Sequence, residues 1–199
     1  DCKIPCVRIP SVVRLGPAKG NSTTLVAVAE CRFRDVGDDC TPNTYMRPNA
    51  TYPDYIDLCS KISNDGGLTW GPIQRNITKL PWWNQNPTMV YDEIRGRILM
   101  HFSRLSMQGL RAEPNQYEHW VTISKDGYTW EKPLLLDQQL KRLSPPAYLS
   151  KPGPGTLTLL KVGAYAGRII VPIYFNHCAG LMQFDCAAAI YTDDGGYDG

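Results

Sequence analysis

A short pattern that recurs along the chain constrains its fold more than any other feature of the sequence. The first copy reads S-N-D-G-G-L-T-W at residues 63–70, and the second reads S-K-D-G-Y-T-W at residues 124–130. A degenerate third copy occupies residues 192–199, with Gly199 at the tryptophan position. A pattern that returns about every sixty residues indicates one structural unit repeated along the chain.

The residues of the pattern are those that a tight turn between two β-strands requires. An aspartate carboxylate can accept hydrogen bonds from backbone N–H groups two residues further on, and glycine adopts the positive φ of a hairpin turn. The tryptophan can anchor the outgoing strand by burying its large apolar ring. We therefore interpret Asp65 and Asp126 as structural residues and not as catalytic carboxylates.

The segments between the copies are typical of short β-strands. Only residues 134–143 carry a helical period, and the sequence S-P-P at residues 144–146 ends it. Together with the repeated turn, this predicts an all-β fold, a β-propeller whose blades are four-stranded sheets. The expected strands are residues 24–29, 56–62, 88–91, 97–102, 119–123, 157–162, 168–175 and 187–191.

The number of turns predicts about three blades, in one partial propeller domain over residues 1–199. Propellers close with roughly four to eight blades, and a three-bladed chain would leave open sheet edges. We therefore expect the remaining blades to come from further sequence or from another chain.

Composition and charge exclude several classes of protein. The net charge is +2 and no basic run is present, whereas nucleic-acid binding needs a concentrated basic face. The longest apolar stretches, such as residues 169–175, are too short to span a membrane. None of the seven cysteines forms a CxxC pair, and the three histidines do not lie at zinc-finger spacing from them. We expect no nucleic-acid partner, no membrane span and no metal site.

Cysteines and glycosylation sequons favour a secreted protein, in an extracellular or lumenal location. Cys31 with Cys40, and Cys178 with Cys186, could each close a loop, and the odd number of cysteines leaves one thiol free or paired outside the chain. The chain begins at Asp1 without a methionine, which we interpret as a processed terminus. Acceptable N-glycosylation sequons begin at Asn21, Asn49 and Asn76.

Four motifs occur in an order that resembles one known family. They are R-I-P at residues 8–10, A-E-C-R at residues 29–32, N-P at residues 86–87 and the repeated turn. In this combination the chain resembles the exo-α-sialidases (neuraminidases) of the bacterial, trypanosomal and animal type. The resemblance runs from Arg8 to the end of the chain and covers about the first half of the family's catalytic domain. It implies a six-bladed propeller, of which this chain supplies about the first three blades.

The resemblance implies residues that bind sialic acid, a sugar with a carboxylate on its anomeric carbon. Sialidases hold this carboxylate with three arginines, since a guanidinium can donate two parallel hydrogen bonds to it. Arg8 matches the first of them and Arg32 matches the second or a flanking arginine, although Val7 stands where the family usually has Phe or Tyr. The structural alternative for each is a surface or ion-paired arginine.

The resemblance also implies a general acid, an aspartate about five or six residues after the second arginine. In the segment F-R-D-V-G-D-D-C at residues 33–40, Asp38 has the best spacing, Asp39 is next, and Asp35 is a weaker option. A bond between Cys31 and Cys40 could pin this loop. The alternative is a solvated acidic turn.

Two further residues match positions that line the family's sugar pocket. Asn86 matches an Asp or Asn that contacts the sugar near its N-acyl group, and Tyr174 matches a tyrosine on the glycerol side. A turn-forming asparagine and a core tyrosine are the structural alternatives. His119 and His177 have no partner group in the sequence, and we interpret them as structural or surface residues.

The family's nucleophile is a tyrosine activated by a glutamate, which follows the third turn with the remaining arginines, so no residue here is assigned that role. The sequence thus predicts a secreted exo-α-sialidase, a retaining glycoside hydrolase that removes terminal sialic acids from glycoconjugates without a metal or organic cofactor. A trans-sialidase is a variant within this class. One alternative is a sialidase-like propeller that binds sialoglycans, or serves as a structural module, without hydrolysis. Another is an unrelated receptor propeller, which the R-I-P and A-E-C-R motifs disfavour.

Overall fold

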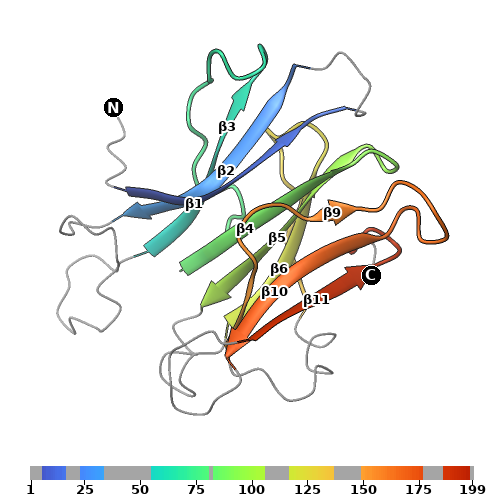
Figure 1. Ribbon diagram of the computed structural model, residues 1–199. Coiled ribbons are helices and arrows are strands. Elements are labelled where there is room, and N and C mark those ends of the chain that lie inside the picture. Colours follow the sequence, from blue (N-terminus) through green and yellow to red (C-terminus); the bar gives the residue numbers. More distant parts are fainter. Residues whose placement is uncertain are drawn as a thin grey trace.

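The computed structural model describes residues 6–16, 23–33, 55–80, 83–105, 117–136, 149–176 and 186–197. Within these residues the chain forms eleven strands in three antiparallel sheets and no helix (Figure 1). The strands are β1 (Cys6–Arg14), β2 (Leu25–Phe33), β3 (Tyr55–Ser63), β4 (Trp83–Asp92), β5 (Arg97–Leu105), β6 (Tyr117–Ser124), β7 (Leu134–Leu135), β8 (Leu149–Pro152), β9 (Thr158–Leu159), β10 (Ile169–Asn176) and β11 (Cys186–Thr192).

Each sheet follows the chain as a meander. Blade 1 has the order β1-β2-β3, and an isolated bridge from Ser60 to Gln74 adds a short fourth row. Blade 2 has the order β4-β5-β6-β7, and in blade 3 both β8 and β9 pair with β10, which β11 follows. The first strands contact one another across the blades, since β4 touches β1, β8 and β9. Figure 1 shows the three blades side by side in chain order, which is the arrangement that the repeat predicts.

The repeated turn is locked by its aspartate in all three copies. Asp65 Oδ1 accepts a hydrogen bond from the Thr69 N–H at 2.9 Å, and Asp126 Oδ1 accepts one from the Thr129 N–H at 2.8 Å. Asp194 Oδ1 accepts one at 2.9 Å from the N–H two residues further on. The hydrogen bonds from Thr69 lower the pKa of the Asp65 carboxyl to about 2. The aspartates thus serve the turn, as the sequence indicated.

The tryptophan of the turn packs against the preceding blade. Trp130, from the turn of blade 2, is buried in a cluster with Val26 and Ile62 of blade 1. Trp70 holds the same position in blade 1 and is 38% exposed. A second apolar cluster, which includes Leu99, joins blades 2 and 3. Apolar contact between blades therefore accounts for the long hydrophobic run of β5, whose residues are buried on both faces.

Several predicted elements differ from the observed ones. Residues 134–143 were the one candidate for a helix, but Leu134 and Leu135 form β7, paired with β6, and residues 137–143 lie outside the described part. The strands β1 and β8 were missed, and β4 begins at Trp83 instead of residue 88. The predicted strand at 157–162 is limited to β9. These errors occur where a proline or a short pairing makes the strand hard to recognise from its sequence, because the position of the strand is set by its partner.

The predicted disulfide between Cys31 and Cys40 is wrong. Cys31 on β2 is bonded to Cys59 on β3, with their Cα atoms 5.9 Å apart. The two strands are neighbours in blade 1, which brings together cysteines that are 28 residues apart in the sequence. Cys6 is also disulfide-bonded. The predicted Cys178–Cys186 bond involves a residue outside the described part.

Candidate functional site

Two β-bulges on the innermost strands shape the candidate site. The register shifts after Arg8 in β1 and after Gln85 in β4. At each bulge the residue that precedes a proline has a positive φ, 51° at Ile9 and 53° at Asn86. A proline cannot donate to the ladder, and a bulge bends the strand and changes the direction of its side chains. The R-I-P and N-P motifs therefore mark equivalent bulges in two successive blades.

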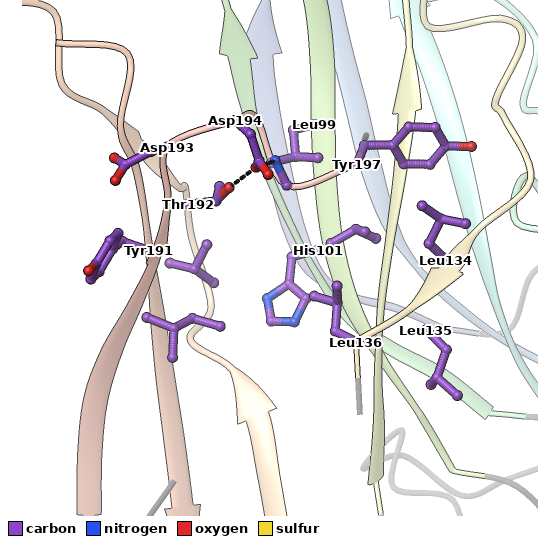
Figure 2. Close-up of a pocket in the computed structure, with 14 residues that line it drawn as sticks. Leu99, His101, Leu134, Leu135, Leu136, Tyr191, Thr192, Asp193, Asp194 and Tyr197 are labelled. Carbon is purple, nitrogen blue, oxygen red and sulfur yellow. Dashed lines mark hydrogen bonds between the residues drawn. The ribbon is translucent and has the colours of Figure 1, made fainter. Parts of the chain in front are cut away.

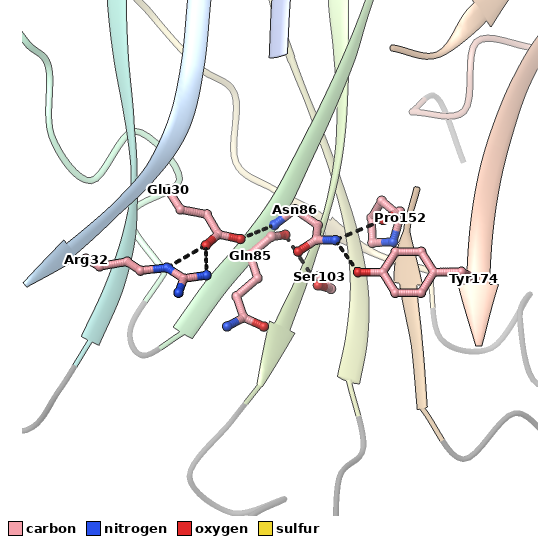
Figure 3. A network of polar contacts seen from close by, with 7 residues as sticks. All are labelled: Glu30, Arg32, Gln85, Asn86, Ser103, Pro152 and Tyr174. Carbon is pink, nitrogen blue, oxygen red and sulfur yellow. Dashed lines mark hydrogen bonds and ion pairs between the residues drawn. The ribbon is translucent and has the colours of Figure 1, made fainter. Parts of the chain in front are cut away.

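Glu30 lies at the centre of a polar network that spans the three blades (Figure 3). Its side chain, on β2, is fully buried. Glu30 Oε2 accepts hydrogen bonds from Arg32 Nε at 2.9 Å and Nη2 at 2.5 Å. Glu30 Oε1 accepts the backbone N–H of Asn86 at 2.9 Å, which the bulge in β4 leaves outside the β4–β5 ladder. The carboxylate thus holds one arginine and one bulged strand in fixed positions.

Asn86 continues the network into blade 3. Its side-chain amide donates to the Tyr174 hydroxyl at 2.6 Å and to the Pro152 carbonyl at 3.1 Å. Asn86 is 5% exposed, so it is a buried bridge between blades and not a surface turn residue. Burial raises the pKa of the Tyr174 phenol above its ordinary value, so the hydroxyl stays protonated at neutral pH.

The network contains three of the residues that the sequence predicted, namely Arg32, Asn86 and Tyr174. Arg8 is exposed on β1, paired with Glu30 in the β1–β2 register, and has no hydrogen-bond or ion-pair partner among the described residues. The predicted acids Asp38, Asp39 and Asp35 lie outside the described residues, as do Asn21 and Asn49. Asn76, the third sequon, is exposed.

Three residues at this site were not predicted. Glu30 belongs to the A-E-C-R motif, where only the arginine was considered. Gln85 is 6% exposed, and its Oε1 has no hydrogen-bond partner among the described residues. Lys151 on β8 places its Nζ 4.2 Å from the centre of the Tyr117 ring. Burial lowers the pKa of Lys151 to about 8, an effect that Glu30 opposes and Arg32 reinforces. The registers of the innermost strands, which the sequence did not supply, connect these positions.

A separate cavity of about 480 Å³ lies between blades 2 and 3, beside the third turn (Figure 2). His101 projects into it from β5, and none of the residues that line it belongs to the Glu30 network. His101 Nε2 lies 2.9 Å from His119 Nδ1, a contact that the sequence did not reveal. Both rings are buried, which makes His119 structural. Burial keeps the pKa of His101 well below its ordinary value.

The chemistry of the Glu30 network suits an anionic ligand better than a cation. Arg32 and Lys151 supply positive charge near one buried carboxylate, which is already bonded to Arg32, and Arg8 pairs with Glu30 in the β1–β2 register. In the described part of the chain, no group of three His, Cys, Asp or Glu side chains could hold a metal ion. No helix among these residues is long and apolar enough to cross a membrane.

No family model and no curated protein matches the chain. Its structure is similar to solved structures of sialidases. The Hadza microbial sialidase Hz136 is 20% identical with a TM-score of 0.65, covering 96% of this chain and 36% of its own. The intramolecular trans-sialidase from Ruminococcus gnavus is 14% identical with a TM-score of 0.65, covering 96% and 59%. The NanB sialidase from Streptococcus pneumoniae is 12% identical with a TM-score of 0.63, covering 96% and 43%.

These similarities concern the fold. The chain forms part of a sialidase-type β-propeller, which confirms the fold class predicted from the repeated turn. It spans between 36% and 59% of the length of the chains that it matches. Three blades are therefore one portion of a larger architecture in those proteins.

Proposed function

We propose that this chain is part of an exo-α-sialidase, a retaining glycoside hydrolase that removes terminal sialic acids from glycoconjugates. The observation that carries the proposal is the Glu30 network. It joins Arg32, Asn86 and Tyr174, each of which matches a sialidase position by its sequence motif. The sialidase-type fold agrees with this assignment. A disulfide within blade 1 is consistent with the proposed secreted location.

The arginines bind the carboxylate of the sugar in this proposal. Arg8 is the free cation of the pair, because it is exposed and unpaired within the described residues. Arg32 is held by Glu30 through two nitrogens, so its guanidinium is fixed in orientation before a ligand arrives. A preorganised guanidinium loses less side-chain entropy when it binds a carboxylate.

In this proposal Asn86 and Tyr174 lie on the side of the site that receives the uncharged part of the sugar. Their mutual hydrogen bond fixes both side chains, and the phenol is a neutral donor at neutral pH. A neutral hydroxyl can donate to a sugar oxygen without repelling the anionic substrate. The tyrosine nucleophile and its glutamate come from sequence that these residues do not include.

Asp38 is the proposed general acid, which protonates the departing glycosidic oxygen. Replacement of Asp38 by Ala in the complete protein is expected to reduce kcat/KM for sialyllactose by at least about a hundredfold. The loss is expected to be smaller for an aryl sialoside, whose phenolate leaves with less need of a proton. Asp39→Ala is the matched control and is expected to retain activity on both substrates.

Two results would overturn the proposal. One is a wild-type protein that binds sialosides without releasing any sialic acid, which would indicate a binding module. The other is full activity of both aspartate variants on sialyllactose, which would remove Asp38 and Asp39 from the mechanism. Analysis of the released sugar in the presence of a lactose acceptor separates hydrolysis from transfer.

A further inference from the structure

The three blades place one polar residue each at the same position of their innermost strands. In each blade, the first residue of the repeated turn pairs with a residue on the neighbouring strand. Five positions beyond that residue lies the one that pairs with the polar residue of the innermost strand. The repeat therefore relates the three positions to one another. The pairs are Arg8 with Glu30 in blade 1, Gln85 with Ser103 in blade 2, and Lys151 with Tyr174 in blade 3.

Lys151 thus occupies in blade 3 the place that Arg8 occupies in blade 1. Its ammonium group stacks on the Tyr117 ring at 4.2 Å. The charges of Glu30 and Arg32 both shift its pKa. Its strand neighbour, Tyr174, is bonded to Asn86 of the central network. The cation is therefore part of the same site and not a distant surface charge.

Gln85, at the equivalent position in blade 2, indicates that a ligand binds near these three positions. Its side chain is 6% exposed, yet Gln85 Oε1 has no hydrogen-bond partner among the described residues. An unpaired buried amide oxygen costs free energy unless something else donates to it. In Figure 3 the amide of Gln85 points away from Tyr174. A polar ligand with hydroxyl or amide donors would satisfy it.

We propose that Lys151 is a further anion-binding residue of this site, beside Arg8 and Arg32, which contacts the negatively charged ligand directly from blade 3 as Arg8 does from blade 1. The inference rests on the proposed function, and it adds a residue for which the sialidase resemblance gave no role. An ammonium group is a compact point charge with three rotatable donors, so it can donate a further hydrogen bond to a carboxylate that a rigid guanidinium already binds. Stacking on the Tyr117 ring limits the conformational freedom of the Lys151 side chain.

The charge of Lys151 also makes the binding of the anionic ligand depend on pH. The groups that face it include Glu30 and Arg32 from β2, Tyr117 from β6 and Tyr174 from β10. Because its pKa is near 8, the ammonium is charged below that pH and becomes neutral as the pH rises through it. Anion binding is therefore strongest below pH 8 and weakens above it.

The test uses the complete protein and the glycal of sialic acid, 2-deoxy-2,3-didehydro-N-acetylneuraminic acid, with its uncharged methyl ester as the matched probe. Calorimetric titration is expected to give about tenfold weaker binding of the acid to Lys151→Met. The ester is expected to bind both proteins within about twofold. Lys161→Met, which removes the same charge from an exposed residue paired with Glu93, is the control and leaves both affinities unchanged.

A pH series provides a second readout. The wild-type affinity for the acid is expected to fall about fivefold between pH 7 and pH 9, while Lys151→Arg, which stays charged, shows a flat profile. If Lys151→Met weakens acid and ester equally, the residue is only structural and the proposal is wrong. An unchanged acid affinity would overturn it too. If the wild-type protein binds neither probe, the proposed function itself has failed.

Discussion

Glu30 illustrates how one residue organises the candidate site. A buried carboxylate is stable only if hydrogen bonds replace its hydration, and here two nitrogens of Arg32 and the N–H of Asn86 do so. The same bonds hold a guanidinium from blade 1 and a bulge from blade 2. Glu30 binds no ligand in our proposal, but the positions of the residues that do so depend on it.

Replacement of Glu30 by Gln is expected to lower the free energy of unfolding by about 3 kcal/mol, because it leaves the largely buried Arg32 without its counter-charge. Urea denaturation measures this change. Glu93→Gln is the control, since Glu93 makes a partly exposed ion pair with Lys161 at 3.2 Å, and its loss is expected to cost less than about 1 kcal/mol. Equal effects of the two substitutions would contradict the central role of Glu30.

At the scale of the strands, equivalent positions in successive blades carry different side chains. Val28 in blade 1 and His101 in blade 2 are equivalent positions. In each blade, the first residue of the repeated turn pairs with a residue on the neighbouring strand, and Val28 or His101 lies three positions beyond that residue. Val28 belongs to the apolar cluster between blades 1 and 2, whereas His101 lines the cavity between blades 2 and 3. His101 Nδ1 has no hydrogen-bond partner among the described residues. Protonation of His101 is therefore expected to weaken this contact between blades.

The buried His101 is expected to make stability fall with acidity. Its pKa is depressed in the folded protein, so below the ordinary value of about 6.5 the unfolded chain gains a proton that the folded chain does not. His101 alone should contribute a decrease of up to about 1.4 kcal/mol per pH unit below that value, while the raised pKa of Asp57, about 6, acts in the opposite direction in both proteins. Denaturation of wild type and His101→Gln at pH 7.5 and 5.5 tests this. The same decrease in both proteins would exclude His101 as its source.

At the scale of the whole molecule, the three blades leave apolar side chains exposed. Val7 and Val12 on β1 are 56% and 45% exposed, and Tyr191 on β11 is 61% exposed. A closed propeller covers the outer faces of every blade with its neighbours. The surfaces of blades 1 and 3 that face away from blade 2 are thus suited to contact with further blades.

The polypeptide of residues 1–199 alone is therefore expected to associate in solution, because burying these faces in another copy removes apolar surface from water. Sedimentation velocity measures its mass at several concentrations. The same blades within the complete native protein are expected to be monodisperse. A single stable species of 22.3 kDa for the isolated polypeptide would contradict this expectation.

The amino-acid sequence is sufficient to define the blade as the unit of the fold. The turn of residues 124–130 closes through hydrogen bonds between residues only a few positions apart, so its residues predict it without knowledge of the rest of the chain. The bulges at R-I-P and N-P were not predicted, because the first motif lies on a strand that was missed and the second was interpreted as a turn.

Which residues meet is decided by the tertiary structure. The bond from Cys31 to Cys59, the contact of Glu30 with Asn86 and the position of Lys151 beside this network depend on the registers of strands and on the packing of one blade against the next. A register shifted by one residue would turn every side chain of a strand to the opposite face, and the pattern of short polar motifs does not specify that shift. The turns could be predicted because they are local. The site could be predicted only in part, because its residues come from three blades.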